Sequence, residues 1–350
     1  MKSDRRIRGA FAALTTVALL ASCSTPPAPP PPPPALPPAL TPPPITLSGS
    51  LIRDAAAYQA YMAKVAAITP DFKSGEDVAG ALKTGDSYDP QQLLRGSIAY
   101  AAIVALQDQN FVTQVQVFAA NPVSRPLLTE DIIGNPSYVV GLKGADGAAG
   151  LVMAALLDQG QKLHASGELV KQSAYSIQRQ TWSQQLVVNR DQRLADAKSV
   201  SNVALLSTTQ DAARLQQAAV GAAPMGLTPV APATQPYPPV VIRGLALAAL
   251  AVLGEAGDDN AARIEPIVGE HVTAACLGDA KLNLYQCLAV SKPHYEDIFC
   301  LGQHVMMDTG QCLMVAAGAP PPIYAPVAHS TTEVAYAPSL APKKKKHAPK

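Results

Sequence analysis

The chain has 350 residues, of which 48% are apolar and 15% charged, a composition that can bury a core and excludes disorder over the whole length. Its 33 prolines gather mainly in residues 26–44, 221–239 and 319–350 and leave room for one large or two modest domains. The formal charge is +1 in total, with +3 in residues 1–22 and +4 in 319–350, so residues 46–318 carry −6. This acidic balance argues against a nucleic-acid-binding core.

A signal peptide is predicted over residues 1–22. Basic residues between positions 2 and 8 precede an apolar run from 9 to 20, which is shorter than the roughly 20 residues that a spanning helix needs. The run ends in a Leu-Ala-Ser-Cys motif at Cys23, which resembles the lipobox of bacterial lipoproteins. The resemblance implies that the signal is cleaved before Cys23 and that this cysteine is acylated and becomes the mature N-terminus.

Lipidation of Cys23 implies a chain that is anchored to a membrane without spanning it, because three acyl chains exceed the two signals that stable anchoring needs. Ser24, where an aspartate would signal retention, implies by the same resemblance the outer membrane of a Gram-negative bacterium. The alternative is an ordinary signal peptide followed by an incidental cysteine.

Residues 23–45 are predicted to be a lipidated cysteine followed by a proline-rich spacer. Proline fixes φ and lacks a backbone donor, so this stretch favours extended polyproline II over helix or strand. At about 3.1 Å per residue, such a spacer would reach very roughly 65–70 Å and hold a domain off the membrane. The alternative is unstructured filler.

Residues 46–220 are predicted to form an all-α, alanine-rich domain. Apolar residues follow three-four spacing, and no convincing alternating strand pattern is seen. Asp89-Pro90, Asn121-Pro122 and Asn135-Pro136 each pair a capping side chain with a proline, which is typical of a helix start. The low aromatic content of 5% favours close-packed helices over a sandwich or barrel.

Residues 144–220 are predicted to form a long antiparallel helical hairpin. Large and small residues alternate along one helix face at spacings of four and three, and the small ones would let a partner helix approach closely. The next stripe in the sequence, over 194–218, is the expected partner, after a break near 189–191. A parallel coiled-coil dimer is the alternative. The first stripe consists of Leu156, Gly160, Leu163, Gly167, Val170, Ala174, Ile177 and Thr181.

Residues 221–239 are predicted to be a proline-rich linker between domains or a long ordered loop, followed by a small helical domain over 240–318. Its helices are expected near 240–254, 259–276, 281–291, 294–305 and 309–317. Four cysteines lie in this domain: Cys276, Cys287, Cys300 and Cys312.

An exported protein sits where disulfides persist, so these four cysteines predict two bridges. We favour the sequential pairs Cys276–Cys287 and Cys300–Cys312 among the three possible connectivities. A metal site is an alternative because three histidines are interspersed with the cysteines, although no paired C-x-x-C occurs; reduced core thiols are another. The histidines are His271, His294 and His304.

Residues 319–350 are predicted to be a proline-rich basic tail. Its charge could attach the chain to an anionic envelope component such as the cell wall or an acidic partner, or it could be a solvated end. The basic residues are Lys343, Lys344, Lys345, Lys346 and Lys350, with one acidic residue in the same segment.

Enzyme motifs are weak in this sequence. Lys83-Thr84-Gly85 matches the K-T-G of serine β-lactamases and penicillin-binding proteins, but no S-x-x-K supplies their nucleophile. Asp308-Thr309-Gly310 matches the aspartic-protease triplet but falls in a predicted helical segment. We therefore expect no cofactor or metal and favour a lipid-anchored structural or interaction protein over an enzyme. A hydrolase of envelope polymers and an accessory factor of an envelope transport or export complex remain alternatives.

Overall fold

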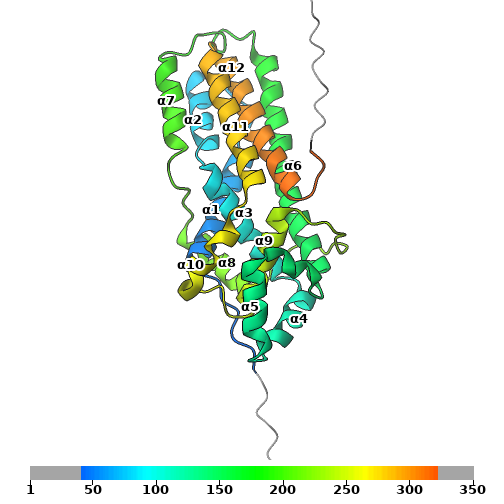
Figure 1. Ribbon diagram of the computed structural model, residues 1–350. Helices are drawn as coiled ribbons and strands as arrows, with labels where there is room; N and C mark the ends of the chain where they lie inside the picture. The colour runs from blue at the N-terminus through cyan, green and yellow to red at the C-terminus, as the bar shows by residue number, and fades with distance from the viewer. Residues whose placement is uncertain (1–40, 322–350) are drawn as a thin grey trace, which may run out of the picture. The chain divides into compact units, whose positions relative to one another are not determined.

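The computed structural model describes residues 41–321. The predicted signal peptide, Cys23, most of the spacer and the five tail lysines lie outside this range. The described residues form one compact unit of helices (Figure 1), without a strand. The prediction of an all-α fold is confirmed for these residues. The helices are α1 (Gly49–Ala66), α2 (Gly75–Gly85), α3 (Pro90–Ala105), α4 (Gln109–Ala119), α5 (Ser124–Gly134), α6 (Ala145–Ile177), α7 (Arg190–Val200), α8 (Thr209–Ala219), α9 (Pro239–Val252), α10 (Ala261–Ile264), α11 (His271–Val290), α12 (His294–Cys300) and α13 (Thr309–Ala316), with 3-10 helices η1 (Pro136–Gly141), η2 (Asp258–Asn260) and η3 (Glu265–Val268) and the π-helix η4 (Leu301–Asp308).

Helix starts follow the capping rules in part. The Asp89 side chain accepts a hydrogen bond from the backbone N–H of Gln92, and the proline after it occupies the first turn of α3. Asn121 caps the turn that leads into α5, which begins three residues later. Asn135-Pro136 starts the 3-10 helix η1 rather than an α-helix.

The core lies around α3 and α9, which are buried on nearly all sides. A Cβ on Gly244 of α9 would lie 2.6 Å from the Cβ of Ala101 of α3, so these helices touch through their backbones. On the other side of α3, a Cβ on Gly96 would lie 2.6 Å from the Asp54 carbonyl oxygen of α1. Alanine and glycine therefore permit this close packing. None of the helices in residues 41–321 is long and apolar enough to cross a membrane.

The predicted boundary at residues 221–239 does not separate two cores. Helix α9 from the predicted second domain packs against α3, and α6 from the first packs against η4 and α13. Residues 221–238 form a loop laid against the start of α6, where the Ala233 N–H donates to the Asp146 carbonyl at 2.9 Å. The alternative of a long ordered loop describes this segment, because helices from both sides of it share one core.

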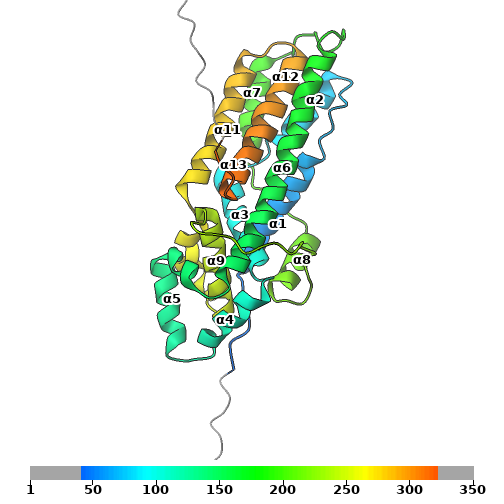
Figure 2. The same ribbon diagram turned by 90° about the vertical axis from the view of Figure 1, so that its right-hand side faces the viewer.

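The face of α6 that carries Gly160 and Gly167, which we call the small-residue seam, packs on a different partner from the one predicted. A Cβ on Gly160 would lie 2.9 Å from the Gly310 carbonyl oxygen, and one on Gly167 would lie 2.8 Å from that of Gly302. The seam is therefore packed within the chain against residues 301–316, beside α6 in both views (Figures 1 and 2). The predicted hairpin with residues 194–218 is wrong in its partner, because α7 packs on α2 and α11 and α8 packs on α1.

Two disulfides staple α11 to the helical segment that follows it. Cys276 bonds to Cys312, and Cys287 bonds to Cys300, each with a Cα–Cα distance of 5.7 Å. The prediction of two bridges is confirmed, and the favoured sequential pairing is wrong. Helix α11 and residues 294–316 lie antiparallel, so the pairs are nested around the turn between them.

Candidate functional site

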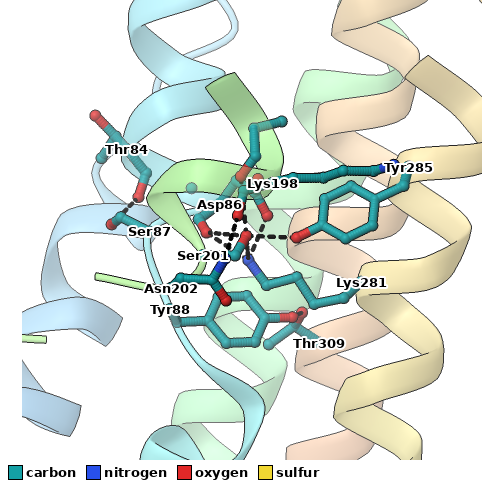
Figure 3. A network of polar contacts seen from close by, with 12 residues as sticks. Thr84, Asp86, Ser87, Tyr88, Lys198, Ser201, Asn202, Lys281, Tyr285 and Thr309 are labelled. Atoms are coloured by element: carbon teal, nitrogen blue, oxygen red, sulfur yellow. Dashed lines mark hydrogen bonds and ion pairs between the residues drawn. The ribbon is translucent and has the colours of Figure 1, made fainter. Parts of the chain in front are cut away.

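A buried polar network joins the ends of α2 and α7 to the middle of α11 (Figure 3). The ammonium group of Lys281 contacts a carboxylate oxygen and the backbone carbonyl of Asp86, and it donates to Ser201 Oγ at 2.9 Å. The Tyr285 hydroxyl donates to the same Ser201 oxygen at 2.5 Å. The lysine also lies over the ring of Tyr88, 3.8 Å from its centroid. Three helices from distant parts of the sequence are thus tied together at one point.

Burial shifts the titration of both charged partners. Loss of water lowers the pKa of Lys281 to about 8, against the opposing effect of Asp86. Burial likewise raises the pKa of Asp86, whose second carboxylate oxygen Oδ2 is buried without a hydrogen-bond partner. Desolvation therefore costs both groups more than their mutual attraction returns, as is common for buried pairs.

The network has the residue types of a serine–lysine nucleophile but not the arrangement. Ser201 Oγ accepts from two donors and lies within hydrogen-bond reach of the carbonyls of Asp86 and Ala197. A nucleophile needs a neutral base with a free lone pair and access to substrate, whereas Ser201 is 6% and Lys281 5% exposed. We interpret the network as a structural junction.

A cleft of about 810 Å³ lies between α2 and α7 and is floored by α11 and the start of α12. Figure 1 shows α7 beside α2, at the same end of the unit as α12. Its apolar lining comes mainly from Leu82, Val187, Val188, Val200 and Leu288. Its polar lining includes Glu76, Lys83, Gln192, Asp196 and His294. An apolar lining with a few polar groups is typical of sites for small molecules.

A buried ion pair forms part of the cleft wall. Arg193 donates to Asp297 Oδ1 at 2.5 Å, and Ser291 Oγ donates to the same oxygen at 2.7 Å. Burial raises the pKa of Asp297, against the lowering effect of these two donors. The Nε of Arg193 is buried without a hydrogen-bond partner. The cleft therefore contains a fixed, poorly solvated charge pair beside its apolar surface.

Helix α7, which forms one side of the cleft, is held mainly by polar contacts. Ala197 is its one buried side chain. Arg190 donates to the carbonyls of Ser291 and Ala289 at 2.8 and 2.9 Å, and Arg193 donates to that of Leu288. Arginines placed on the last carbonyls of α11 satisfy acceptors that the helix leaves free and complement its dipole. This attachment leaves the cleft open between α7 and the face of α2 that lines it.

The three histidines interspersed with the cysteines lie in three different elements, α11, α12 and η4. His294 lines the cleft, with its ring packed on Gly75, where a Cβ would lie 2.3 Å from the ring. His304 Nδ1 lies 2.8 Å from Asp308 Oδ2 within η4, and His271 begins α11. Because all four cysteines are in disulfides, the alternative of a Cys–His metal site lacks its thiolates.

The two motif fragments have structural roles. Thr84 of the K-T-G triplet donates to the Gly80 carbonyl inside α2, and a Cβ on Gly85 would lie 2.6 Å from Val305. Thr309 of the D-T-G triplet bonds to the buried hydroxyl of Tyr88 at 3.0 Å.

Neither the cleft nor the network was predicted from the sequence. A usable signal existed for the network, because Lys281 occupies the buried face of α11 together with Leu277, Leu284 and Leu288. A lysine at such a position implies a buried partner. Comparison with protein-family models, curated proteins and solved structures found no match to this chain.

Proposed function

We propose that the chain is a lipid-anchored protein of the cell envelope that acts as a binding or scaffolding module, with the α2–α7 cleft as its ligand site. Anchoring rests on the lipobox at Cys23. Export is supported by the two disulfides, which persist in oxidising compartments. The lysines from 343 onward would supply a second, salt-sensitive attachment to an anionic envelope component.

The observation that carries the proposal is the cleft itself. Its volume of about 810 Å³ falls in the range of ligand pockets. The apolar lining suits a hydrocarbon or aromatic part of a ligand, and the partly desolvated Arg193–Asp297 pair suits a polar part. An amphipathic small molecule or a short peptide segment matches both features.

The test places a photo-crosslinking amino acid at Val188, an exposed residue of the cleft wall, and irradiates intact cells. The blocking variant is Gly80→Phe. Gly80 lines the cleft on α2, and a Cβ there meets nothing within 4 Å, so the added ring would occupy the cleft without a clash at its base. The matched control is Gly278→Phe on α11, which also meets nothing within 4 Å and does not line the cleft.

We expect a defined adduct at position 188 that disappears with Gly80→Phe and persists with Gly278→Phe. An adduct that survives the blocking variant would contradict a ligand site in the cleft. Loss of the adduct in both variants would equally contradict it, since the control leaves the cleft open.

Hydrolysis of an envelope polymer is the second candidate, and the buried carboxyl of Asp297 favours it. A raised carboxyl pKa in a cleft is typical of a general acid. Its Oδ1, however, is engaged by Arg193 and Ser291, so we rank binding first. Soluble product released from purified cell-wall sacculi by the wild-type chain, and lost in Asp297→Asn, would reverse the order.

The tail is tested by co-sedimentation of the unlipidated mature chain with sacculi or anionic vesicles, with and without residues 341–350. We expect the truncated chain, which lacks the five tail lysines, to bind less at low salt. The difference should shrink as salt rises, because exposed charges are screened beyond about 8 Å at physiological ionic strength. Equal binding by both forms would remove the second attachment.

A further inference from the structure

The connection between α4 and α5 presents an exposed apolar surface, which we call the apolar tip. Val123 is 70% exposed, Val117 is 66% exposed and Leu127 is 62% exposed. The tip consists of Val117, Phe118, Pro122, Val123, Pro126 and Leu127. Soluble proteins scatter single apolar residues over their surface, but a contiguous group on a protruding turn indicates an interaction site.

The segment that carries the apolar tip contains a single charged residue, which is positive. Residues 109–129 contain no acidic side chain, and Arg125 is their one charged residue. The next acidic residues follow on α5: Glu130, which is paired with Arg263 of α10, and the exposed Asp131. The surface therefore offers apolar side chains and a single cation in an otherwise acidic unit.

The apolar tip lies at the end of the unit where the described chain begins. In both views the first described residues, drawn in blue, approach the same end as the connection between α4 and α5 (Figures 1 and 2). The connection between α6 and α7, which contains Trp182, lies at the opposite end. Thr41 follows Cys23 by 18 residues, which as extended polyproline II at about 3.1 Å each would span about 56 Å between the anchor and Thr41.

We propose that the apolar tip inserts into the interfacial layer of the bilayer that holds the lipid anchor. This inference rests on the proposed anchoring at Cys23. The valine, leucine and phenylalanine side chains would enter the boundary between headgroups and acyl chains, while Arg125 would reach the phosphates. A proline-rich tether stays stiff over only several residues, so it limits the distance of the unit from the membrane without preventing a return to it.

The positional test uses tryptophan fluorescence of the lipidated mature chain in vesicles of phosphatidylethanolamine and phosphatidylglycerol that contain brominated lipid. The reporter is Val123→Trp. The matched control is Leu282→Trp, at an exposed apolar position of α11, and native Trp182 is a second control in the unsubstituted chain. We expect bromolipid to quench the reporter at 123 and to leave the residues at 182 and 282 unquenched.

The energetic test measures partitioning of the unlipidated mature chain, carrying Cys23→Ser, onto the same vesicles at physiological salt. The tip triple variant replaces two valines and one leucine by serine, and the control triple variant replaces the same residue types on α11. We expect the tip variant to bind about tenfold more weakly and the control to change less than twofold. The variants are Val117→Ser/Val123→Ser/Leu127→Ser and Val272→Ser/Leu282→Ser/Val290→Ser, all at exposed positions.

The two tests distinguish a failure of the apolar-tip proposal from a failure of the proposed anchoring at Cys23. A mature chain with native Cys23 that remains in the soluble fraction would refute the anchoring. An anchored chain whose reporter at position 123 is not quenched would refute the apolar tip alone. A tip triple variant that sediments as a monomer where the wild-type chain is a dimer would show that the tip binds a second copy and would overturn the inference. Equal melting temperatures of the triple variants establish that loss of fold does not explain the result.

Discussion

The contact between α6 and the segment 301–316 predicts that a single methyl group will destabilise the chain. Gly167→Ala places a Cβ 2.6 Å from the Met306 Cβ and 2.8 Å from the Gly302 carbonyl oxygen. Gly160→Ala places one 2.9 Å from the Gly310 carbonyl oxygen. These are mostly backbone atoms of the partner helix, so no side-chain rotation relieves the contact, and the helices must move apart.

The magnitude follows from two opposing effects. Replacing glycine by alanine inside a helix stabilises it by roughly 1 kcal/mol, because glycine loses more backbone entropy on folding. Overpacking costs about 1–3 kcal/mol and occasionally more. Because the contacts at Gly160 and Gly167 involve backbone on both sides, we expect a cost at the upper end of this range, about 2–3 kcal/mol, and therefore a net loss of about 1–2 kcal/mol. For a chain of this size that corresponds to a fall in melting temperature of roughly 2–8 °C.

Two other helical glycines provide matched controls for this experiment. A Cβ at Gly80 of α2 or Gly278 of α11 meets nothing within 4 Å, so alanine there should raise the free energy of unfolding by about 0.5–1 kcal/mol. The four variants are compared by thermal and urea denaturation with the disulfides intact. If Gly160→Ala and Gly167→Ala gained as much stability as the controls, the close approach of α6 to residues 301–316 would be refuted.

Three further predictions concern single groups. Because burial lowers the pKa of Lys281 to about 8, the unfolded chain binds more protons between pH 8 and 10. Urea denaturation should therefore show that the free energy of unfolding of the wild type, relative to that of Asp86→Asn/Lys281→Met, rises between pH 8 and 10 by up to about 1.4 kcal/mol per pH unit. A difference that does not change with pH would show that the lysine does not titrate in this range. Non-reducing peptide mapping should find Cys276 joined to Cys312, 36 residues apart, and a sequential pairing would contradict the fold. Replacing both cysteines by alanine should lower the free energy of unfolding by about 4 kcal/mol. Cys23→Ser should leave the precursor unprocessed or release the chain from membranes, and unchanged mass and membrane retention would exclude lipidation.

Much of the fold could be predicted from local chemistry. The proline after Asp89 marks the start of α3 because capping and a fixed φ act within a single turn. The apolar stretch at 240–253 could be recognised as buried because it is too short to span a bilayer, and it corresponds to α9. Helix starts and the burial of a helix depend on residues within one turn or one helix, so they can be predicted from the sequence.

The disulfide pairing was missed because it depends on how two helices lie together. In an antiparallel pair of helices, facing residues are equally distant from the turn. Cys276 and Cys312 have their midpoint at residue 294, and Cys287 and Cys300 have theirs between 293 and 294, next to the turn after α11. The sequential pairing required a break near 305–309, whereas residues 294–316 form one continuous helical segment.

The buried lysine shows a different limit. Its place on the apolar face of α11 implies a partner, and the helix pattern alone reaches that conclusion. Asp86, however, lies 195 residues earlier at the end of a short helix, and many acidic residues lie at helix ends in this chain. Only the packing of α2, α7 and α11 brings Asp86 and Ser201 to Lys281, so the identity of the partner is a property of the tertiary structure.

The sequence correctly predicts a close helix contact along the small-residue seam of α6, but it indicates the wrong partner, and the reason lies in η4. Gly160 and Gly167 are seven residues apart, but the glycines that face them, Gly310 and Gly302, are eight residues apart. In a uniform α-helix an eight-residue spacing would drift off the seam. Residues 301–308 form a π-helix, which takes more residues per turn, so the extra residue is absorbed and both glycines face α6. A search for a partner stripe with the α-helical period passes over this segment, and the π-helix is therefore the feature that permits the contact and conceals it from periodicity analysis.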